Sequence, residues 1–143
     1  MDVASILKTK GNAVATVTRD SSLQDVAGLL ASKRIGAIVI TSAEGVVEGI
    51  VSERDIVKAI ANRGGACLAE AVGNIMTRDV TTTEPRESID HVMSLMTAGR
   101  FRHVPVVENG RLVGIVSIGD AVKHHMAEVE LEASQLKNYV LAG

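Results

Sequence analysis

Residues 45–58 of the chain read GVVEGIVSERDIVK, and residues 110–123 read GRLVGIVSIGDAVK. At a shift of 65 residues, eight of these 14 aligned positions are identical, including the Gly-Ile-Val-Ser run and the Asp three residues after it. Further upstream the shift becomes 66, and Ser22 to Val26 aligns with Ser88 to Val92. Self-similarity at a fixed spacing is the sequence signature of structural repeats. We therefore predict that the chain consists of two homologous halves.

Each half predicts the same series of elements, β-α-β-β-α. Apolar residues recur at helical spacing after Ser22 and after Ser88, and serine is a favoured helix N-cap. We predict that these helices end at or near Gly36 and Gly99, because glycine tolerates the left-handed conformation that often ends a helix. Short apolar runs are typical of buried strands. The predicted strands are residues 14–17, 37–41 and 46–51 in the first half, and 80–83, 103–107 and 111–116 in the second.

The turns and the strand count predict how these elements are assembled. Asn109-Gly110 is a strong hairpin signal, and Pro105 inside a strand pattern predicts an edge position or a strand end. Neither half alone covers both faces of a three-stranded sheet, so we expect an α/β (α+β) fold in which two β-α-β-β-α repeats pack sheet-to-sheet with pseudo-two-fold symmetry. The expected divisions are a first repeat with its N-terminal lead segment (1–62), a linker helix (63–79), a second repeat (80–126) and a C-terminal helical extension (127–143).

Composition and charge exclude several classes of function. The only aromatic residues are Phe101 and Tyr139, which is too few for stacking on single-stranded nucleic acid. A net charge of −2 leaves no global basic surface for duplex DNA or an anionic membrane, and no apolar run approaches the roughly 20 residues that cross a bilayer. The single Cys67 allows no internal disulfide and no cysteine-based zinc cluster. We therefore expect a cytoplasmic protein without a metal site or an obligatory cofactor.

The two repeats, each ending Gly-Ile-Val-Ser-x-x-Asp, resemble a tandem pair of cystathionine-β-synthase (CBS) domains, also called a Bateman module. The most specific segments are residues 49–55 (GIVSERD), 102–106 (RHVPV) and 114–120 (GIVSIGD). Because the chain carries no catalytic domain, it resembles the stand-alone bacterial type. The resemblance implies a regulatory protein rather than an enzyme, which binds adenosine nucleotides in clefts between the repeats. It further implies AMP, ADP or ATP as the ligand, with NAD as a further candidate, a homodimer, and a regulated protein that the sequence does not identify.

The residues themselves favour a binding site at the strand–helix junctions. Ser52 and Ser117 stand where a strand ends and a helix begins, and Asp55 and Asp120 follow in the first helical turn. A helix N-terminus presents unpaired N–H groups and a partial positive charge, which suit a phosphate. A carboxylate beside it is able to accept two hydrogen bonds from a ribose diol, so we predict that both aspartates hold ribose.

Cationic and apolar residues complete the predicted ligand-binding set. Arg54 is within reach of a phosphate, whereas Gly119 takes its place in the second repeat, so we expect the two sites to bind unequally. Arg102 and His103 form the densest cationic spot in the chain. The set also includes Thr16 and Thr82, which the resemblance implies near the first strand of each repeat, and Ile38, Val104 and Pro105. Ile38 and Val104 are expected to sandwich the adenine, together with their neighbours Val14, Val80, Ile50 and Ile115.

Simpler interpretations of the same residues stay open. Ser-x-x-Asp is also a capping-box variant, and Ser22-x-x-Asp25 shows it at a helix for which we predict no ligand. Arg102 also fits a solvated strand residue, and His103 fits a core histidine. Two other functions therefore remain: a ligand-independent dimerisation or scaffold module, and a nucleotide hydrolase that uses His103 with an acidic partner. The hydrolase is disfavoured because the chain has neither a Walker phosphate loop nor a nucleophile elbow.

Overall fold

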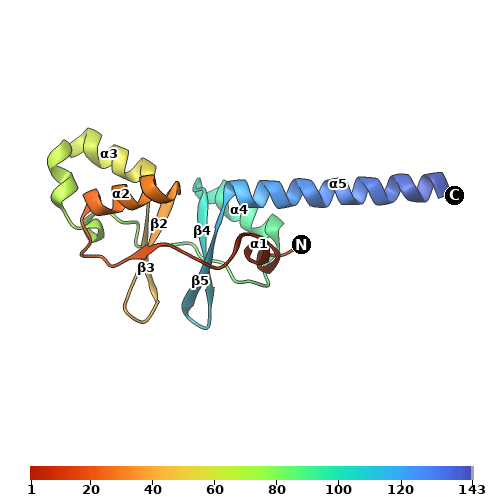
Figure 1. Cartoon of the computed structure of the whole chain (residues 1–143), viewed down its shortest axis with the longest axis horizontal. Coiled ribbons are helices and arrows are strands. Elements are labelled where there is room, and N and C mark those ends of the chain that lie inside the picture. Colours follow the sequence, from red (N-terminus) through yellow and green to blue (C-terminus); the bar gives the residue numbers. More distant parts are fainter. Residues whose placement is uncertain (143) are drawn as a thin grey trace. The chain divides into compact units, whose positions relative to one another are not determined.

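The computed structural model describes residues 1–142 and confirms a mixed α/β fold with five α-helices and small sheets (Figure 1). The helices are α1 (Val3–Lys10), α2 (Leu23–Lys33), α3 (Glu53–Arg63), α4 (Ile89–Gly99) and α5 (Ile118–Ala142), with short 3-10 helices η1 (Gly65–Ala69) and η2 (Val72–Asn74). The strands are β1 (Thr16–Val17), β2 (Ala37–Thr41), β3 (Val47–Ser52), β4 (His103–Glu108) and β5 (Arg111–Ser117). None of the helices within residues 1–142 has the length and apolar character needed to span a membrane.

The chain divides into two compact units, each built around one repeat. The first-repeat unit consists of residues 13–81 together with 107–113, and the second-repeat unit consists of residues 1–12, 82–106 and the segment from Gly114 onward. The lead segment, which we expected with the first repeat, therefore groups with the second. Backbone hydrogen bonds explain this placement, because the N–H groups of Val3 and Ala4 donate to the carbonyls of Glu87 and Pro85 at 2.9 and 2.8 Å.

The first-repeat unit contains a three-stranded sheet in the order β1-β2-β3. β1 runs parallel to β2, with Thr16 opposite Val39, and the crossover between them contains α2. β2 and β3 are antiparallel, with Ile38 opposite Val51. Gly45 closes the hairpin between them with a φ of 80°, a conformation that favours glycine. The order β-α-β-β-α predicted for the first repeat is confirmed.

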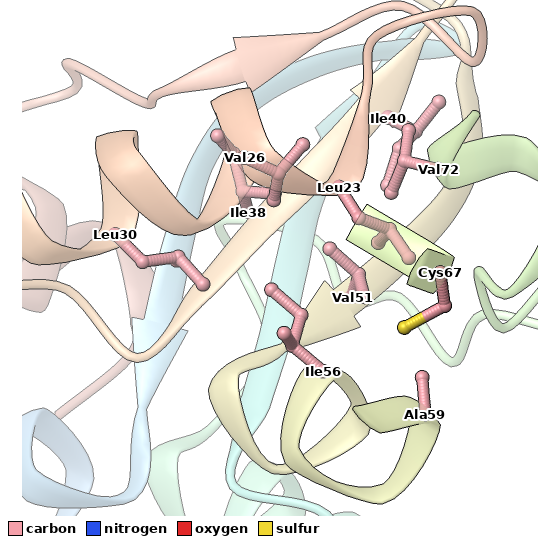
Figure 2. Packing of buried hydrophobic residues seen from close by; sticks show 10 residues of the cluster. All are labelled: Leu23, Val26, Leu30, Ile38, Ile40, Val51, Ile56, Ala59, Cys67 and Val72. Atoms are coloured by element: carbon pink, nitrogen blue, oxygen red, sulfur yellow. The ribbon is translucent and has the colours of Figure 1, made fainter. Parts of the chain in front are cut away.

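One apolar core holds this unit together (Figure 2). In Figure 2, Ile38 of β2 lies near Val26 of α2, Ile40 lies near Val72 of η2, and Ile56 of α3 lies on the other side of the cluster. Burying a side chain of this size stabilises the fold by about 1.5–3 kcal/mol. The core therefore fixes the end of β3 and the start of α3, where the predicted site residues lie. The cluster consists of Leu23, Val26, Leu30, Ile38, Ile40, Val51, Ile56, Ala59, Cys67 and Val72.

The linker helix expected over residues 63–79 is replaced by the two short 3-10 helices. Gly64, with a φ of 79°, ends α3 and prevents a continuous helix. The two 3-10 helices have short-range bonds of their own, but the N–H groups of Val72 and Gly73 donate to the loop before α2, to the carbonyls of Ser21 and Arg19 at 2.7 and 2.9 Å. At these two residues tertiary hydrogen bonds replace the bonds of a continuous helix.

The second-repeat unit has a smaller sheet than predicted, formed by β4 and β5 alone. The Asn109-Gly110 hairpin is confirmed, with φ values of 53° and 78° at the two residues. The strand expected over 80–83 contributes a single parallel bridge, in which the Thr83 N–H donates to the Pro105 carbonyl at 3.0 Å. Pro105 has no N–H to return, which limits a longer ladder on this edge of β4. The predicted edge position of Pro105 is therefore confirmed.

The helices end at or near Gly36 and Gly99 as predicted, but neither glycine is the left-handed residue that caps the helix. α2 and α4 both end in an arginine with left-handed backbone, Arg34 with a φ of 54° and Arg100 with a φ of 57°. Gly36 lies beyond the end of α2, and Gly99 is the last residue of α4. A side chain at Gly99 would collide with the ring of Phe101. Close packing, and not a positive φ, therefore explains the glycine at position 99.

Candidate functional site

The junction between β3 and α3 is organised by a capping box. The Asp55 N–H donates to Ser52 Oγ at 3.2 Å, and the Ser52 N–H donates to Asp55 Oδ2 at 2.8 Å. The first helical N–H, that of Glu53, donates to the carbonyl of Gly36 at 2.9 Å. Asp55 is half-buried, and its Oδ1 has no hydrogen-bond donor within the described residues 1–142. One carboxylate oxygen therefore caps the helix, while the other is available to a ligand.

The junction between β5 and α5 repeats this geometry. The Asp120 N–H donates to Ser117 Oγ at 3.1 Å, and the Ser117 N–H donates to Asp120 Oδ2 at 3.0 Å. The Ile118 N–H donates to the carbonyl of Arg102 at 2.8 Å, as Glu53 donates to Gly36 in the other repeat. Both aspartates thus have the capping role that the sequence left as an alternative. Capping does not exclude a ligand role, because each carboxylate uses one oxygen for the cap.

A lysine distinguishes the second junction from the first. Lys10, at the end of α1, donates to Asp120 Oδ2 at 2.7 Å and to the Ile115 carbonyl at 2.9 Å. The Lys10 and Asp120 side chains are 31% and 25% exposed. Partial burial acts to raise the pKa of Asp120, but hydrogen bonds from Lys10 and Ser117 and the Lys10 charge outweigh it and lower the pKa below that of an ordinary aspartate.

Sequence reasoning missed Lys10. It lies in the lead segment, outside both copies of the Gly-Ile-Val-Ser-x-x-Asp motif, and 110 residues separate it from Asp120. Only the docking of α1 within the second-repeat unit brings the ammonium group to the carboxylate. No local pattern in the lead segment signals this contact.

Each junction receives one arginine, but from a different position. Arg54 is exposed in the first turn of α3, and its counterpart in α5 is Gly119. Arg102 is exposed immediately before β4, and its counterpart in the first repeat is Gly36. The Arg102 backbone lies at its junction, because its carbonyl accepts from the first N–H of α5. Each repeat therefore has one arginine whose backbone lies at its junction, at a different sequence position in the two repeats.

The remaining polar candidates lie on the strands or beside them. Thr16 is exposed on β1, and Thr82 is exposed next to the bridge that Thr83 makes with β4. His103 begins β4 and is half-buried. Thr83, which sequence reasoning did not select, is 5% exposed, and its Oγ1 has no hydrogen-bond partner within residues 1–142. A buried hydroxyl without a partner is uncommon, so Thr83 joins the candidates.

The apolar candidates are core residues in this structure. Ile38 and Val104 are both 0% exposed, and Ile38 packs within the cluster of α2 and α3 (Figure 2). Pro105 is also buried. Ile50 and Ile115 alternate along their strands with the buried Val51 and Val116 and remain partly exposed. Among the apolar residues considered, these two are therefore more accessible to a ligand than the pair selected from the sequence.

The family model for the CBS domain matches the chain twice, over residues 3–62 and 72–127. The chain belongs to the CBS-domain family. Its repeat pattern, its paired strand–helix junctions and these two matches agree, so the resemblance seen in the sequence is confirmed.

Solved CBS structures share both the fold and most of the length of the chain. The CBS-domain protein ATU1752 of Agrobacterium tumefaciens is 50% identical, with a TM-score of 0.84, and the match covers 87% of this chain and 99% of that one. The CBS pair of MJ0100, in complex with 5′-methylthioadenosine and S-adenosyl-L-methionine, is 29% identical with a TM-score of 0.80 and covers 90% and 98%. PAE2072 of Pyrobaculum aerophilum, complexed with AMP, is 28% identical with a TM-score of 0.76 and covers 84% and 89%.

Proposed function

We propose that the protein is a regulatory module that binds an adenosine nucleotide, works as a homodimer and changes its affinity for a protein partner when the ligand binds. The observation that carries the proposal is the pair of junctions at which a half-buried aspartate uses one oxygen for the cap and keeps the other available. A ribose diol is a donor pair that suits such an oxygen, and hydrogen bonds to a charged acceptor contribute about 1.5–3 kcal/mol each.

The ligands of related structures support an adenosine compound. AMP, 5′-methylthioadenosine and S-adenosyl-L-methionine occur in the complexes of PAE2072 and MJ0100. Adenine and ribose are what these three compounds share, whereas only AMP carries a phosphate. We therefore assign the shared ribose to Asp55 and Asp120, and any phosphate to Arg54 or Arg102.

Further residues refine the proposed sites. Ser52 and Ser117, which cap the helices, are proposed to lie beside the phosphate or ribose, and Thr16, Thr82 and His103 to add polar contacts. We further propose that Ile50 and Ile115 supply apolar contacts to the adenine, because their side chains are partly exposed. ATP, ADP and NAD stay candidates, together with the three compounds above.

Calorimetric titration tests the proposal with AMP, ADP, ATP, NAD, S-adenosyl-L-methionine and 5′-methylthioadenosine in turn. At a hundredfold excess over Kd, a ligand stabilises the fold by about 2.7 kcal/mol, which raises Tm by several degrees to about ten for a chain of this size. Asp55→Asn and Asp120→Asn keep an oxygen for the cap but remove the charge, so each is expected to weaken binding about tenfold. Asp55→Asn is expected to lose little stability, whereas Asp120→Asn also loses the ion pair with Lys10 and is expected to be less stable. Asp25→Asn, at the first turn of α2, is the matched control.

A ligand-independent scaffold is the second candidate function, and the closed capping boxes favour it. In each box, Ser and Asp satisfy each other's backbone N–H groups without any ligand. The scaffold predicts no heat of binding and no Tm shift with any of the six compounds. It also predicts that Asp55→Ala combined with Asp120→Ala leaves partner binding unchanged and costs about 0.5–2 kcal/mol of stability per site.

A further inference from the structure

Helix α5 carries an apolar stripe that its own unit leaves uncovered. Figure 1 shows α4 beside the first part of α5, whereas the rest of α5 extends past it. The five large side chains of the stripe are between 38% and 66% exposed. Exposed apolar residues in isolation are ordinary, but a contiguous row marks an interaction surface. The stripe consists of Val122, Met126, Val129, Ala133, Leu136 and Val140.

The spacing along this stripe is that of a coiled coil. Successive members are separated by four, three, four, three and four residues. This alternation gives three heptads in which Met126, Ala133 and Val140 occupy the a positions and the other three the d positions. Three further apolar residues on α5, Leu131, Tyr139 and Leu141, are exposed but do not follow this alternation.

Contacts within the second-repeat unit use positions of α5 outside the a and d seam, including the flanking g position of His125, whose Nδ1 lies 3.2 Å from Asp90 Oδ1 of α4. Ala121 is the only buried residue of α5 within the described residues. The amino group of Met1 lies 3.4 Å from Glu128 Oε1, and Glu128 is at a c position outside the stripe. The heptad seam is therefore left for another helix.

We infer that residues 122–142 of α5 form a parallel, in-register, two-stranded coiled coil with α5 of a second copy. This inference identifies the interface of the homodimer proposed above, and it does not require a nucleotide. The seam is roughly 30 Å long at 1.5 Å per residue, and an apolar a/d repeat is the contact surface of a coiled coil, for which a second copy supplies a seam of the same length. Ala133 is too small to fill its a position in the seam. We therefore expect a weak dimer, whose fraction rises with protein concentration.

The flanking charges decide the orientation. In a parallel pair, Glu132 at a g position faces Lys137 at the following e position of the other helix, and symmetry forms this attraction twice. In an antiparallel pair with the same seam, Glu132 faces Glu132, Glu130 faces Glu130, and Lys123 faces Lys137 of the second copy. Like charges at such positions destabilise a pair, and opposite charges stabilise it.

Sedimentation equilibrium of the full chain tests the interface. The wild type is expected to exceed the monomer mass of 15.0 kDa as its concentration rises. Leu136→Asp places a charge in the seam, and we expect it to raise the dissociation constant at least tenfold. Leu131→Asp, on the same helix but off the seam, is the matched control and keeps the wild-type value; circular dichroism checks that both variants are folded. A wild type that remains at 15.0 kDa, or an equal effect of both substitutions, overturns the inference.

Charge exchange tests the orientation separately. Glu132→Lys alone and Lys137→Glu alone each replace two attractions by two repulsions, so we expect about five- to thirtyfold weaker association. The double variant Glu132→Lys with Lys137→Glu restores association in a parallel pair. Glu132→Gln distinguishes the alternative, because it strengthens an antiparallel pair and weakens a parallel one; strengthening would overturn the proposed orientation. A dimer without any nucleotide response would reject the ligand proposal and leave this one intact.

Discussion

Replacing Lys10 by methionine measures the contribution of the lead segment to the second junction. The ammonium group donates to Asp120 Oδ2 at 2.7 Å and to the Ile115 carbonyl at 2.9 Å, and both side chains of the ion pair are less than a third exposed. A shielded hydrogen bond to a charged group contributes about 1.5–3 kcal/mol, whereas an exposed ion pair contributes about 0.2–1 kcal/mol. For this partly exposed pair we expect Lys10→Met to lower the free energy of unfolding by about 1–2 kcal/mol at neutral pH.

The pH dependence of this loss follows from the lowered pKa of Asp120. An aspartate whose pKa is lower in the folded state contributes stability above its unfolded pKa of about 4, and loses it as the pH falls through the folded pKa. The difference in the free energy of unfolding between wild type and Lys10→Met is therefore largest at pH 7 and smaller below about pH 4. Part of the difference remains at low pH, because the hydrogen bond from Lys10 to the Ile115 carbonyl does not depend on the ionisation of Asp120.

Urea unfolding at pH 7, 5, 4 and 3.5 is the assay. A loss of 1–2 kcal/mol lowers the midpoint by roughly 0.5–1 M when the m-value is unchanged. Lys8→Met is the matched control, because Lys8 occupies the same last turn of α1 and is exposed. Equal midpoints for both variants at pH 7, or a gap for Lys10→Met that widens as the pH falls, would refute this reasoning.

Two further predictions concern backbone and packing. Gly49→Ala places a Cβ 2.5 Å from Met76 Sδ and 3.0 Å from the Thr77 carbonyl, so we expect a loss of about 1–3 kcal/mol in urea unfolding. Gly28→Ala, in α2 with nothing within 4 Å of the new Cβ, is its control and should gain about 0.5–1 kcal/mol. Arg100→Gly relieves a φ of 57° at the end of α4 and should raise Tm by a few degrees, and an unchanged or lower Tm would show that the arginine is held there by contacts of its own.

The sequence predicts the repeat architecture well because local signals agree with the packing. Serine caps, helical apolar spacing and the Asn109-Gly110 turn all specify conformation within a few residues, and α2, α4 and the second hairpin form as expected. The capping boxes at Ser52 and Ser117 belong to the same group. Agreement between local propensity and tertiary structure is what makes these elements predictable.

The features that sequence reasoning missed depend on contacts between distant residues. The segment after Gly64 forms two short 3-10 helices in place of one helix, and between Ala71 and Asn74 the N–H groups of Val72 and Gly73 bond to the loop before α2. The strand expected over 80–83 shrinks to one bridge because Pro105 has no N–H to donate. Lys10 reaches Asp120 only after α1 has docked. In each case the decisive partner is far away in the sequence, where periodicity carries no information.

The burial of Ile38 and Val104 shows a second limit. Both lie in short apolar strands, and alternation along a strand predicts two faces without saying which of them a ligand contacts. The structure places Ile38 in the core of its unit, while its hairpin partner strand keeps Ile50 partly exposed. The contact of Ile38 and Val104 with the adenine therefore stays a prediction, beside the contacts proposed for Ile50 and Ile115.

The two junctions share a Ser–Asp capping box but differ in charge, and this difference predicts unequal binding at the two proposed sites. Both have the Ser–Asp box, yet only Asp120 already has a cation, Lys10, at the oxygen that caps the helix. Arg54 projects from the helix at the first junction, whereas Arg102 precedes the strand at the second. On the proposed function, a ligand at Asp55 meets a carboxylate with no ion pair to a lysine within residues 1–142, and a ligand at Asp120 meets one already paired with Lys10. Because Lys10 adds a positive charge at the second junction, we predict that AMP has a stronger preference over 5′-methylthioadenosine there than at the first, which calorimetric titration of Asp55→Asn and Asp120→Asn compares.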